Sequence, residues 1–268
     1  MPTQTKPFKV DALTVQIFSD VQALGAAAGD YSGSIIRQAI RLRGAARIVV
    51  GTGNSQLHVI ERLAGQPDIK WSAVEAFHLD EYVGIGPDHP ASFRRWLEHH
   101  LVQNVRPGKV HYLAGDAADY QAEIHRYSNL LMQAPIDLCF VGFGENGHIA
   151  FNDPHVANFS DAALVKRVRL DEVCRRQQVG EGHFPDIESV PVEALTLTCP
   201  ALTRGGTWIC CVPDSRKAAA VKCALEGPVS TACPASLARV HPHAYLYLDT
   251  NSASLLSSQL VDKAIENN

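Results

Sequence analysis

The strongest constraint on the fold of this chain is an alternation along its whole length between short apolar runs and longer stretches of helical period. The runs are rich in β-branched and aromatic residues, as strands are, whereas the stretches between them repeat apolar side chains at helical spacing. Strands that alternate with helices favour an α/β fold with a largely parallel sheet flanked by helices. No composition break marks a linker and no repeat of fixed period occurs, so we expect a single doubly wound domain over residues 1–268.

The alternation also gives the approximate bounds of the elements. The predicted strands are 13–18, 47–50, 73–78, 136–141, 194–198, 207–212 and 244–248. The predicted helices are 20–42 with Ser19 as N-cap, a helix through Leu57, Ile60 and Leu63, and helices at 92–101, 120–132, 215–225 and 254–266.

Charge and composition exclude several classes of protein. With 24 Lys and Arg against 28 Asp and Glu, the formal net charge is −4, so the chain lacks the basic surplus of a nucleic-acid-binding protein. Its apolar runs are far shorter than the roughly 20 residues that cross a bilayer, and its polar start has no signal-peptide core. The seven cysteines include no CxxC pair, which favours reduced thiols. We therefore expect a cytoplasmic protein without membrane or nucleic-acid partners.

Polar or glycine-rich segments directly follow three of the predicted strands, at 51–55, 80–81 and 142–153. In an open parallel sheet, ligands bind outside the carboxyl ends of the strands. We therefore expect these three segments to face a single crevice.

The segment Gly51-Thr52-Gly53-Asn54-Ser55 is a turn of small residues that leads into a helix. Glycines let backbone N–H groups approach an anion, the helix start carries partial positive charge, and Thr52 and Ser55 add hydroxyl donors. These properties suit a phosphate group, although a plain tight turn capped by Asn54 or Ser55 explains the segment equally well. It has neither the Gly-Lys-Ser/Thr of a P-loop nor the GxGxxG spacing of a dinucleotide site.

Asp80 and Glu81 are adjacent carboxylates at the end of an apolar strand. Burial and the charge of its neighbour can tune one such carboxylate as a general base. Taken alone, the pair is explained more simply as a turn acid or a helix N-cap.

His148 lies in a glycine-rich turn, with Asn146 two residues before it and Asp153 five residues after it. An imidazole held by such neighbours can transfer protons near neutral pH. A single histidine is usually structural, but glycines on both sides favour exposure to a ligand. No second histidine stands at metal-ligand spacing, so we expect no metal.

Lys217 opens a helix after the predicted strand 207–212. There its ammonium can point toward an anion in the same crevice. A solvated lysine in a first helical turn is an equally common arrangement.

Together and in this order, these segments resemble the glucosamine-6-phosphate deaminase family, part of a larger group that includes the 6-phosphogluconolactonases. The resemblance spans almost the whole chain. It is carried by the Thr52-Gly53 loop, FHLDEYVG at 77–84, His89-Pro90, GFGENGHIAFNDP at 142–154, Ala194-Leu195-Thr196, Ser215-Arg216-Lys217, Glu226-Gly227, Pro234-Ala235-Ser236 and His241-Pro242.

The resemblance implies a Rossmann-like fold and conversion of glucosamine 6-phosphate and water to fructose 6-phosphate and ammonia, with no cofactor. It implies that His148 opens the pyranose ring and that Asp80 moves a proton from C2 to C1, leaving an imine that water hydrolyses. A carboxylate and an imidazole are the two acid–base groups that such an aldose–ketose shift needs. The residues implied to bind the sugar and its phosphate are Thr52, Gly53, Asn54, Ser55, Glu81, Gly144, Gly147 and Lys217.

The chain departs from the family pattern at three places. Asn146 stands where many members have Asp, and it can orient an imidazole but cannot take a proton. Asp153 replaces the usual Glu and is one methylene shorter, so either the backbone moves in, a water bridges, or the substrate differs. The family's arginine before a Phe-Phe pair is not evident, and Arg175 or Arg176 is expected to serve the phosphate instead. Residues for an allosteric activator do not map, so we expect no such regulation.

Other functions stay open. A 6-phosphogluconolactonase typically has Asp-Glu-Arg and Gly-His-Thr-Ala-Ser-Leu-Phe-Pro where this chain has Asp80-Glu81-Tyr82 and the segment 147–154. A galactosamine-6-phosphate deaminase/isomerase acts on a substrate that differs only at C4, which the sequence does not distinguish. A sugar-phosphate sensor would carry a basic helix-turn-helix, which the first 45 residues do not supply. Assembly into a homo-oligomer is also left open.

Overall fold

In the computed structural model, which describes residues 5–260, eight strands form one sheet in the order β1-β2-β11-β10-β7-β3-β4-β6. Neighbouring strands in it are parallel except β1 and β2. The strands are β1 (Phe8–Val10), β2 (Leu13–Phe18), β3 (Ala46–Val50), β4 (Val74–His78), β6 (Lys109–His111), β7 (Leu138–Val141), β10 (Thr207–Val212) and β11 (Ala244–Asp249).

Chain order reverses between β3 and β7. From β3 the chain proceeds outward through β4 to β6, whereas β7 leads in the other direction to β10 and β11. In a doubly wound sheet this switch point leaves a crevice outside the carboxyl ends of the two strands. The segments 51–55 and 142–153 follow these two strands, so the fold brings them together as the sequence predicted.

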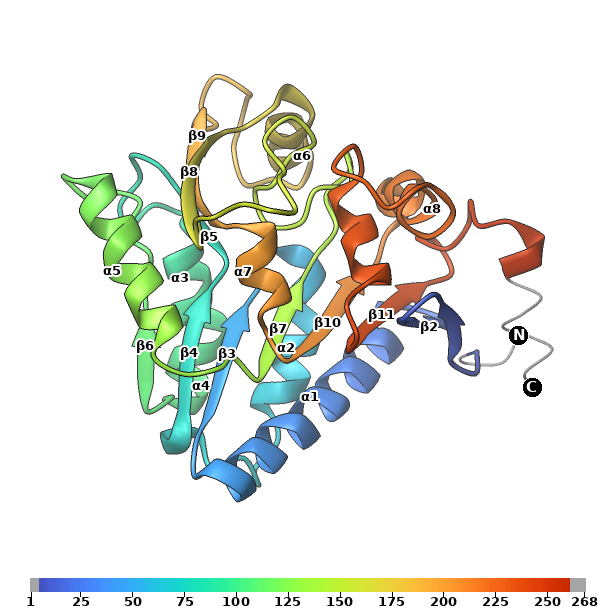
Figure 1. Cartoon of the computed structure of the whole chain (residues 1–268), viewed down its shortest axis with the longest axis horizontal. Coiled ribbons are helices and arrows are strands. Elements are labelled where there is room, and N and C mark those ends of the chain that lie inside the picture. The colour runs from blue at the N-terminus through green and yellow to red at the C-terminus, as the bar shows by residue number, and fades with distance from the viewer. Residues whose placement is uncertain (1–4, 261–268) are drawn as a thin grey trace.

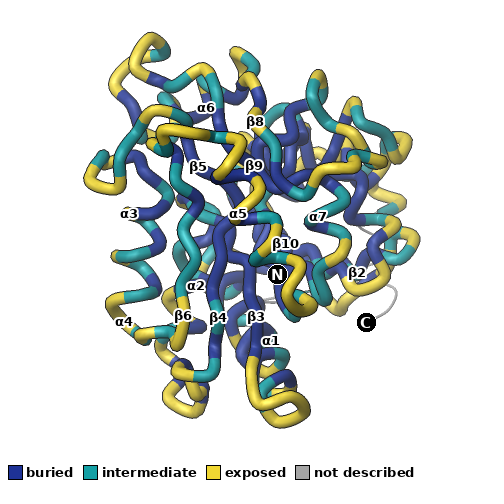
Figure 2. The backbone as a smooth tube through the Cα atoms, turned by 60° about the vertical axis from the view of Figure 1, so that its left-hand side comes forward, coloured by how far each residue is buried: buried dark blue, intermediate teal, exposed yellow. Residues whose placement is uncertain are grey.

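Helices cover both faces of the main sheet (Figure 1). They are α1 (Val21–Arg43), α2 (Leu57–Ala64), α3 (Phe93–Leu97), α4 (Gln103–Val105), α5 (Tyr120–Met132), α6 (Glu172–Gly180), α7 (Cys199–Thr203) and α8 (Ala218–Glu226). Alternate residues of β3 divide between two cores, because successive strand side chains point to opposite faces. Ile48 and Val50 pack with α1 and α2, while Val49 packs with α5, α7 and α8. The central strands β3, β7 and β10 are accordingly buried almost throughout, whereas the edge strand β6 is not (Figure 2).

A second, antiparallel sheet lies with α6 above the upper edge of the main sheet (Figure 1). Its strands are β5 (Asp80–Tyr82), β9 (Glu193–Leu197) and β8 (Val165–Arg169), in the order β5-β9-β8. It has its own core, which includes Tyr82, Phe151 and Phe184. The chain crosses between the sheets at Leu79, whose N–H donates to Val50 in β3 and whose carbonyl accepts from Leu197 in β9.

Several sequence predictions need correction. The segment 194–198 is β9 of the small sheet and not a strand of the main one, because a short apolar run does not reveal which sheet it joins. The N-cap of α1 is Asp20, whose carboxylate accepts from the N–H of Ala23, and not Ser19. The predicted helix 92–101 is α3 followed by a π-helical turn (Glu98–Val102) and α4. The helix expected at 254–266 lies partly outside the described residues, and its first residues form turns.

Three glycines let α1 and α2 pack very closely. A Cβ added at Gly25, Gly29 or Gly33 would lie 2.5, 2.7 or 2.0 Å from an atom of His58, Arg62 or Gln66 respectively. This packing fixes α2, and with it the segment 51–55 that precedes it. Among residues 5–260, no helix has both the length and the apolar character that crossing a bilayer requires.

Candidate active site

A cavity of about 80 Å³ lies at the crevice between the loops that follow β3 and β7. Eight of the fourteen site residues predicted from the sequence line it. They come from four separate segments of the chain, so the cavity exists only in the folded protein. Its lining residues are Gly51, Thr52, Gly53, Asn54, Ser55, Leu79, Asp80, Phe93, Gly142, Phe143, Gly144, His148, Ala150, Phe151, Gln177, Gln178, Glu181, His183 and Lys217.

The segment 51–55 forms one wall of the cavity. Gly53 has φ +100° and ψ 176°, a conformation that side chains rarely adopt. The next residues form a 3₁₀ turn (Asn54–Gln56) that leads into α2. The buried Gln56 side chain donates to Ser55 Oγ (3.0 Å) and to the carbonyl of Cys211 (3.3 Å), which ties the loop to β10. Its four predicted phosphate residues, Thr52 to Ser55, all line the cavity.

Asp80 is the first residue of β5 and lines the cavity, although the residue is only 6% exposed. Burial raises the pKa of its carboxyl well above the ordinary value, and the neighbouring Glu81 carboxylate raises it further. A carboxylate with a raised pKa is a stronger base, which is what proton abstraction near neutral pH requires.

The Glu81 side chain is engaged away from the cavity. Its Oε2 accepts from Ser92 Oγ (2.7 Å) and from the N–H of Arg94 (3.0 Å). Its Oε1 accepts from the N–H groups of Tyr82 (3.0 Å) and Phe93 (3.2 Å). Glu81 therefore holds the start of α3 and is not among the cavity-lining residues, contrary to the substrate-binding role expected from the sequence.

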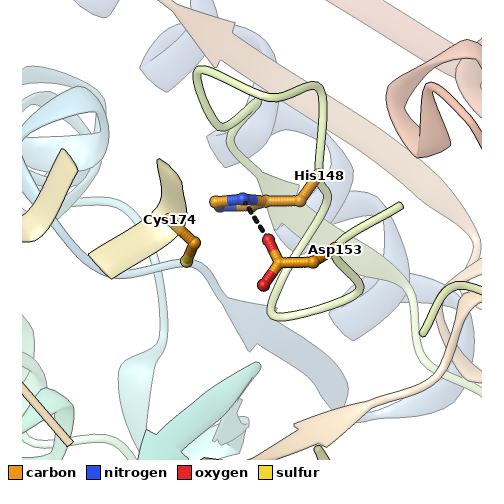
Figure 3. A group of neighbouring side chains, drawn as sticks. All are labelled: His148, Asp153 and Cys174. Carbon is orange, nitrogen blue, oxygen red and sulfur yellow. Dashed lines mark ion pairs between the residues drawn. The ribbon is translucent and has the colours of Figure 1, made fainter. Parts of the chain in front are cut away.

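His148 and Asp153 form a buried pair (Figure 3). Nδ1 of His148 lies 3.0 Å from Oδ1 of Asp153, and the Asp153 side chain is fully buried. Burial would raise the pKa of Asp153, but His148, the Asn146 amide and the N–H of Asp171 outweigh it, so the pKa is lowered. The carboxylate therefore stays charged and holds the imidazole ring by Nδ1.

Asn146 connects this pair to the rest of the loop. Its Nδ2 donates to Asp153 Oδ1 (2.9 Å) and to Asp171 Oδ2 (2.7 Å), and its Oδ1 accepts from the N–H of His148 (3.0 Å). It does not line the cavity, and it acts by orienting His148 and Asp153. Gly147 also lies behind the cavity wall, where its carbonyl accepts from the N–H of Ala235 (2.8 Å).

The short side chain of Asp153 is already within reach of His148, because its backbone lies close. Both of its oxygens accept hydrogen bonds and no part of the side chain is exposed, so an added methylene has no room.

We expect Asp153→Glu to lower the free energy of unfolding by about 1–3 kcal/mol and to lower kcat. Urea unfolding and initial rates measure the two effects, with Asp88→Glu at an exposed site as the control. Unchanged stability and activity would mean that the site accepts the longer acid.

Gly144 lies directly against the His148 ring. A Cβ at this position would lie 2.1–2.3 Å from three atoms of the imidazole, so any side chain displaces the ring. We expect Gly144→Ala to reduce kcat/KM roughly 10²-fold, the effect of a misplaced catalytic group. Gly65→Ala is the matched control, because its Cβ meets no atom closer than 3.4 Å. Equal activity of both variants would contradict a requirement for this ring position.

Lys217 reaches the cavity at the end of a 3₁₀ turn (Ser215–Lys217) that follows β10. Its Nζ lies 2.9 Å from Oε1 of Glu181, just beyond the end of α6. The predicted cation is thus present in the cavity, but it is paired with a carboxylate that sequence reasoning did not assign.

Arg175 and Arg176 are not brought to the cavity. Arg175 donates through Nη2 to the carbonyls of Ile187 and Val190, and Arg176 pairs with Glu172 on the exposed side of α6. The residues of α6 that do line the cavity are Gln177 and Gln178, followed by Glu181 and His183. The polar run QQVGEGH at 177–183 was the available signal, because it has four such side chains within seven residues.

One group of side chains could hold a metal ion. Ligand atoms of His148, Asp153 and Cys174 all lie within 4.8 Å of one another (Figure 3). A second group, Asp153, His155 and Asp171, meets the same criterion. Both include Asp153, so an ion in either would compete with the His148–Asp153 pair.

The chain is similar in sequence to proteins of one known family. A family model described as "Glucosamine-6-phosphate isomerases/6-phosphogluconolactonase" matches residues 19–246. A protein of Arthrobacter sp. strain FB24, named glucosamine-6-phosphate deaminase, is 33% identical over 251 residues, which are 91% of this chain and 93% of that protein. A protein of the same name from Exiguobacterium sibiricum is 34% identical over 212 residues, covering 79% of this chain and 82% of that protein.

Solved structures match over most of the chain. A structure reported as a monomeric glucosamine-6-phosphate deaminase has a TM-score of 0.83 at 27% identity and covers 90% of this chain and 99% of that chain. A 6-phosphogluconolactonase from Shewanella baltica OS155 has a TM-score of 0.75 at 20% identity, covering 90% of this chain and 99% of that chain, a likeness that shows the fold alone. The Rossmann-like α/β fold predicted from the sequence is confirmed.

Proposed function

Because this chain belongs to the glucosamine-6-phosphate isomerase and 6-phosphogluconolactonase family, we propose that it is a glucosamine-6-phosphate deaminase. The reaction converts glucosamine 6-phosphate and water to fructose 6-phosphate and ammonia. The names of the relatives at 33% and 34% identity support this substrate over the lactone. The observation that carries the proposal is the meeting of Asp80, His148, Lys217 and the 52–55 loop in one cavity.

His148 is proposed to open the sugar ring. Its ring faces the cavity while Nδ1 is held by Asp153, which leaves Nε2 for the substrate. An imidazole in this position gives a proton to the ring oxygen and takes one from the C1 hydroxyl, so that the open-chain aldehyde forms. Asp153 stabilises the protonated ring during this exchange, and Asn146 keeps Asp153 in place.

Asp80 is proposed to move the proton between carbons. In the open-chain form the carboxylate takes the proton from C2 and delivers it to C1, so the bond shift produces a ketose imine. Water then adds at C2 and ammonia leaves. Its raised pKa favours uptake of a proton from carbon, which an ordinary surface aspartate accepts poorly.

The phosphate is proposed to bind between the 52–55 loop and Lys217. Backbone N–H groups, two hydroxyls and one ammonium form a suitable set of donors for a dianion. Anchoring the remote phosphate holds C1 and C2 in position for proton transfer.

The proposal is tested with the purified protein and three substrates assayed in parallel. Release of ammonia and fructose 6-phosphate from glucosamine 6-phosphate is the expected result. Faster turnover of galactosamine 6-phosphate would assign the other epimer, and turnover of 6-phosphogluconolactone alone would overturn the proposal. Tight binding of the sugar phosphate with no turnover would indicate a sensor.

We also propose that the enzyme works in the cytoplasm with a sugar phosphate as its ligand. All seven cysteines are free, which is the usual state in a reducing compartment. Fractionation of the source cells tests the location.

A further inference from the structure

Lys217 is paired with a carboxylate of the protein itself. Among the described residues that line the cavity, it is the only lysine or arginine. Its Nζ lies 2.9 Å from Glu181 Oε1, and the two side chains are only 5% and 10% exposed. The charge that would attract a phosphate is therefore already paired with a carboxylate.

The Glu181 carboxylate is held in its charged form by several neighbours. Burial alone would raise its pKa, but His183 and Lys217 lower it to about 2. Gln177 Nε2 also donates to Oε1 at 2.9 Å. At neutral pH a phosphate dianion that approached Lys217 would meet this fixed negative charge and be repelled.

The segment that carries Glu181 is also bound by Asn54 of the proposed phosphate loop and by Arg216. Asn54 Nδ2 donates to the carbonyl of Glu181 (3.3 Å), and Arg216, the neighbour of Lys217, donates to the carbonyl of Gly180 (3.3 Å). Two residues of the proposed phosphate end, Asn54 and Lys217, thus already contact Glu181.

Glu181 and Lys217 also separate two hollows. The catalytic cavity measures about 80 Å³, against the roughly 300–1,000 Å³ typical of ligand pockets. A second hollow of about 330 Å³ lies beside it and shares Asn54, Ser55, Glu181 and Lys217 with it. Because Glu181 lines both hollows, its withdrawal would widen the space next to Lys217.

Steric hindrance to a change in the backbone next to Glu181 is small, and the N–H of Glu181 is held by a hydrogen bond to the carbonyl of Gln177. Glycines flank it on both sides, and Gly182 has φ +82° with no atom within 4 Å of an added Cβ. A short segment between two glycines can change its backbone angles at little steric cost.

From these observations we infer that Glu181 is an internal substitute for the substrate phosphate. The gate segment, residues 180–183, closes the empty site by pairing Glu181 with Lys217, and an entering phosphate displaces the carboxylate and opens the gate. Glu181 thereby lowers the affinity of the site for every anion. Only an anion that binds Lys217 more tightly than the Glu181 carboxylate does, such as a phosphate dianion, opens the gate. The inference rests on the proposed phosphate end of the site and not on the deamination chemistry.

The test is a calorimetric titration of wild type and Glu181→Gln with inorganic phosphate. Removal of the Glu181 carboxylate is expected to lower the apparent dissociation constant for phosphate about tenfold or more. The reason is that the form with a free Lys217, which binds phosphate, is then no longer depleted by the form in which Glu181 occupies Lys217. Glu145→Gln is the matched control, since its charge also acts on Arg216. The control removes a nearby negative charge without removing the partner of Lys217, so it is expected to change the affinity much less.

Thermal unfolding gives a second readout. Without phosphate, Glu181→Gln is expected to have a lower Tm than wild type, because buried Lys217 loses its counter-charge. With phosphate its Tm is expected to rise more than that of wild type, since the ligand now supplies that charge. In the double variant with Lys217→Met, the gain in phosphate affinity is expected to disappear.

Weaker or unchanged phosphate binding by Glu181→Gln would overturn the inference, as would an equal gain in Glu145→Gln. If Glu181→Gln does not fold, Glu181→Asp keeps the charge but shortens its reach, and the inference then requires tighter phosphate binding than in wild type. All of these measurements use inorganic phosphate and no turnover. A protein that binds phosphate as expected but does not deaminate would disprove the proposed function and leave the inference standing.

Discussion

Asparagine in place of Asp80 is expected to lower kcat about 10²–10⁴-fold and to leave the affinity for inorganic phosphate unchanged. The amide has the shape of the carboxylate but cannot take the C2 proton. Uptake of deuterium from D₂O at C1 of the product follows this step directly. Retained exchange in Asp80→Asn would remove Asp80 from the role of base.

The same variant is expected to be more stable than wild type at neutral pH. Burial and Glu81 raise the pKa of Asp80 in the folded protein above its unfolded value, so ionisation opposes folding. This penalty is present above the folded pKa and vanishes below the unfolded pKa. The Tm of Asp80→Asn should therefore exceed that of wild type at pH 7, and the difference should shrink as the pH falls. Lower activity with higher stability would identify a functional residue and not a structural one.

Glutamine in place of His148 is expected to lower kcat/KM by roughly 10²–10⁴-fold, because an amide does not exchange protons with the ring oxygen and C1 hydroxyl. Asp153 loses its imidazole partner, so the free energy of unfolding is expected to fall by about 1–3 kcal/mol. Urea unfolding measures this loss.

The pH dependence of that stability loss has a definite sign. The pKa of Asp153 is lowered in the folded protein, so its contribution is present above the unfolded pKa and is lost as the pH falls through the folded pKa. The difference between wild type and His148→Gln should therefore be largest at neutral pH. His125→Gln, exposed on α5, is the control and should match wild type in rate and stability. Full activity in His148→Gln would exclude ring opening by this residue.

The sequence was sufficient for the main sheet and for where the site lies in it. Strand runs such as 207–212 and the helix 120–132 match the structure residue for residue, because each is a continuous apolar or amphipathic pattern bounded by polar turns. The loops that follow these strands can also be located from the sequence, which is enough to predict that the 52–55 loop, Asp80 and His148 lie at one edge of the sheet.

What the sequence could not provide were contacts between segments far apart in the chain. Glu81 and Asp80 are indistinguishable as a dipeptide, and only the packing of α3 against Glu81 shows that one of the two is structural. The sequence predicts Arg175 or Arg176 as a phosphate ligand, but helical geometry turns Gln177 toward the cavity and Arg175 toward the carbonyls of Ile187 and Val190. The pairing of Lys217 with Glu181 joins residues 36 positions apart and leaves no local pattern.

The crossing at Leu79 has an energetic consequence for the whole chain. Asp80 belongs to the small sheet, whereas the 52–55 loop extends from the main sheet. A ligand held at both ends would act as a non-covalent cross-link between the two sheets. At a concentration one hundred times its dissociation constant, such a ligand adds about 2.7 kcal/mol to the stability of the folded state. The lifetime of the enzyme in the cell would then depend on the supply of its own substrate.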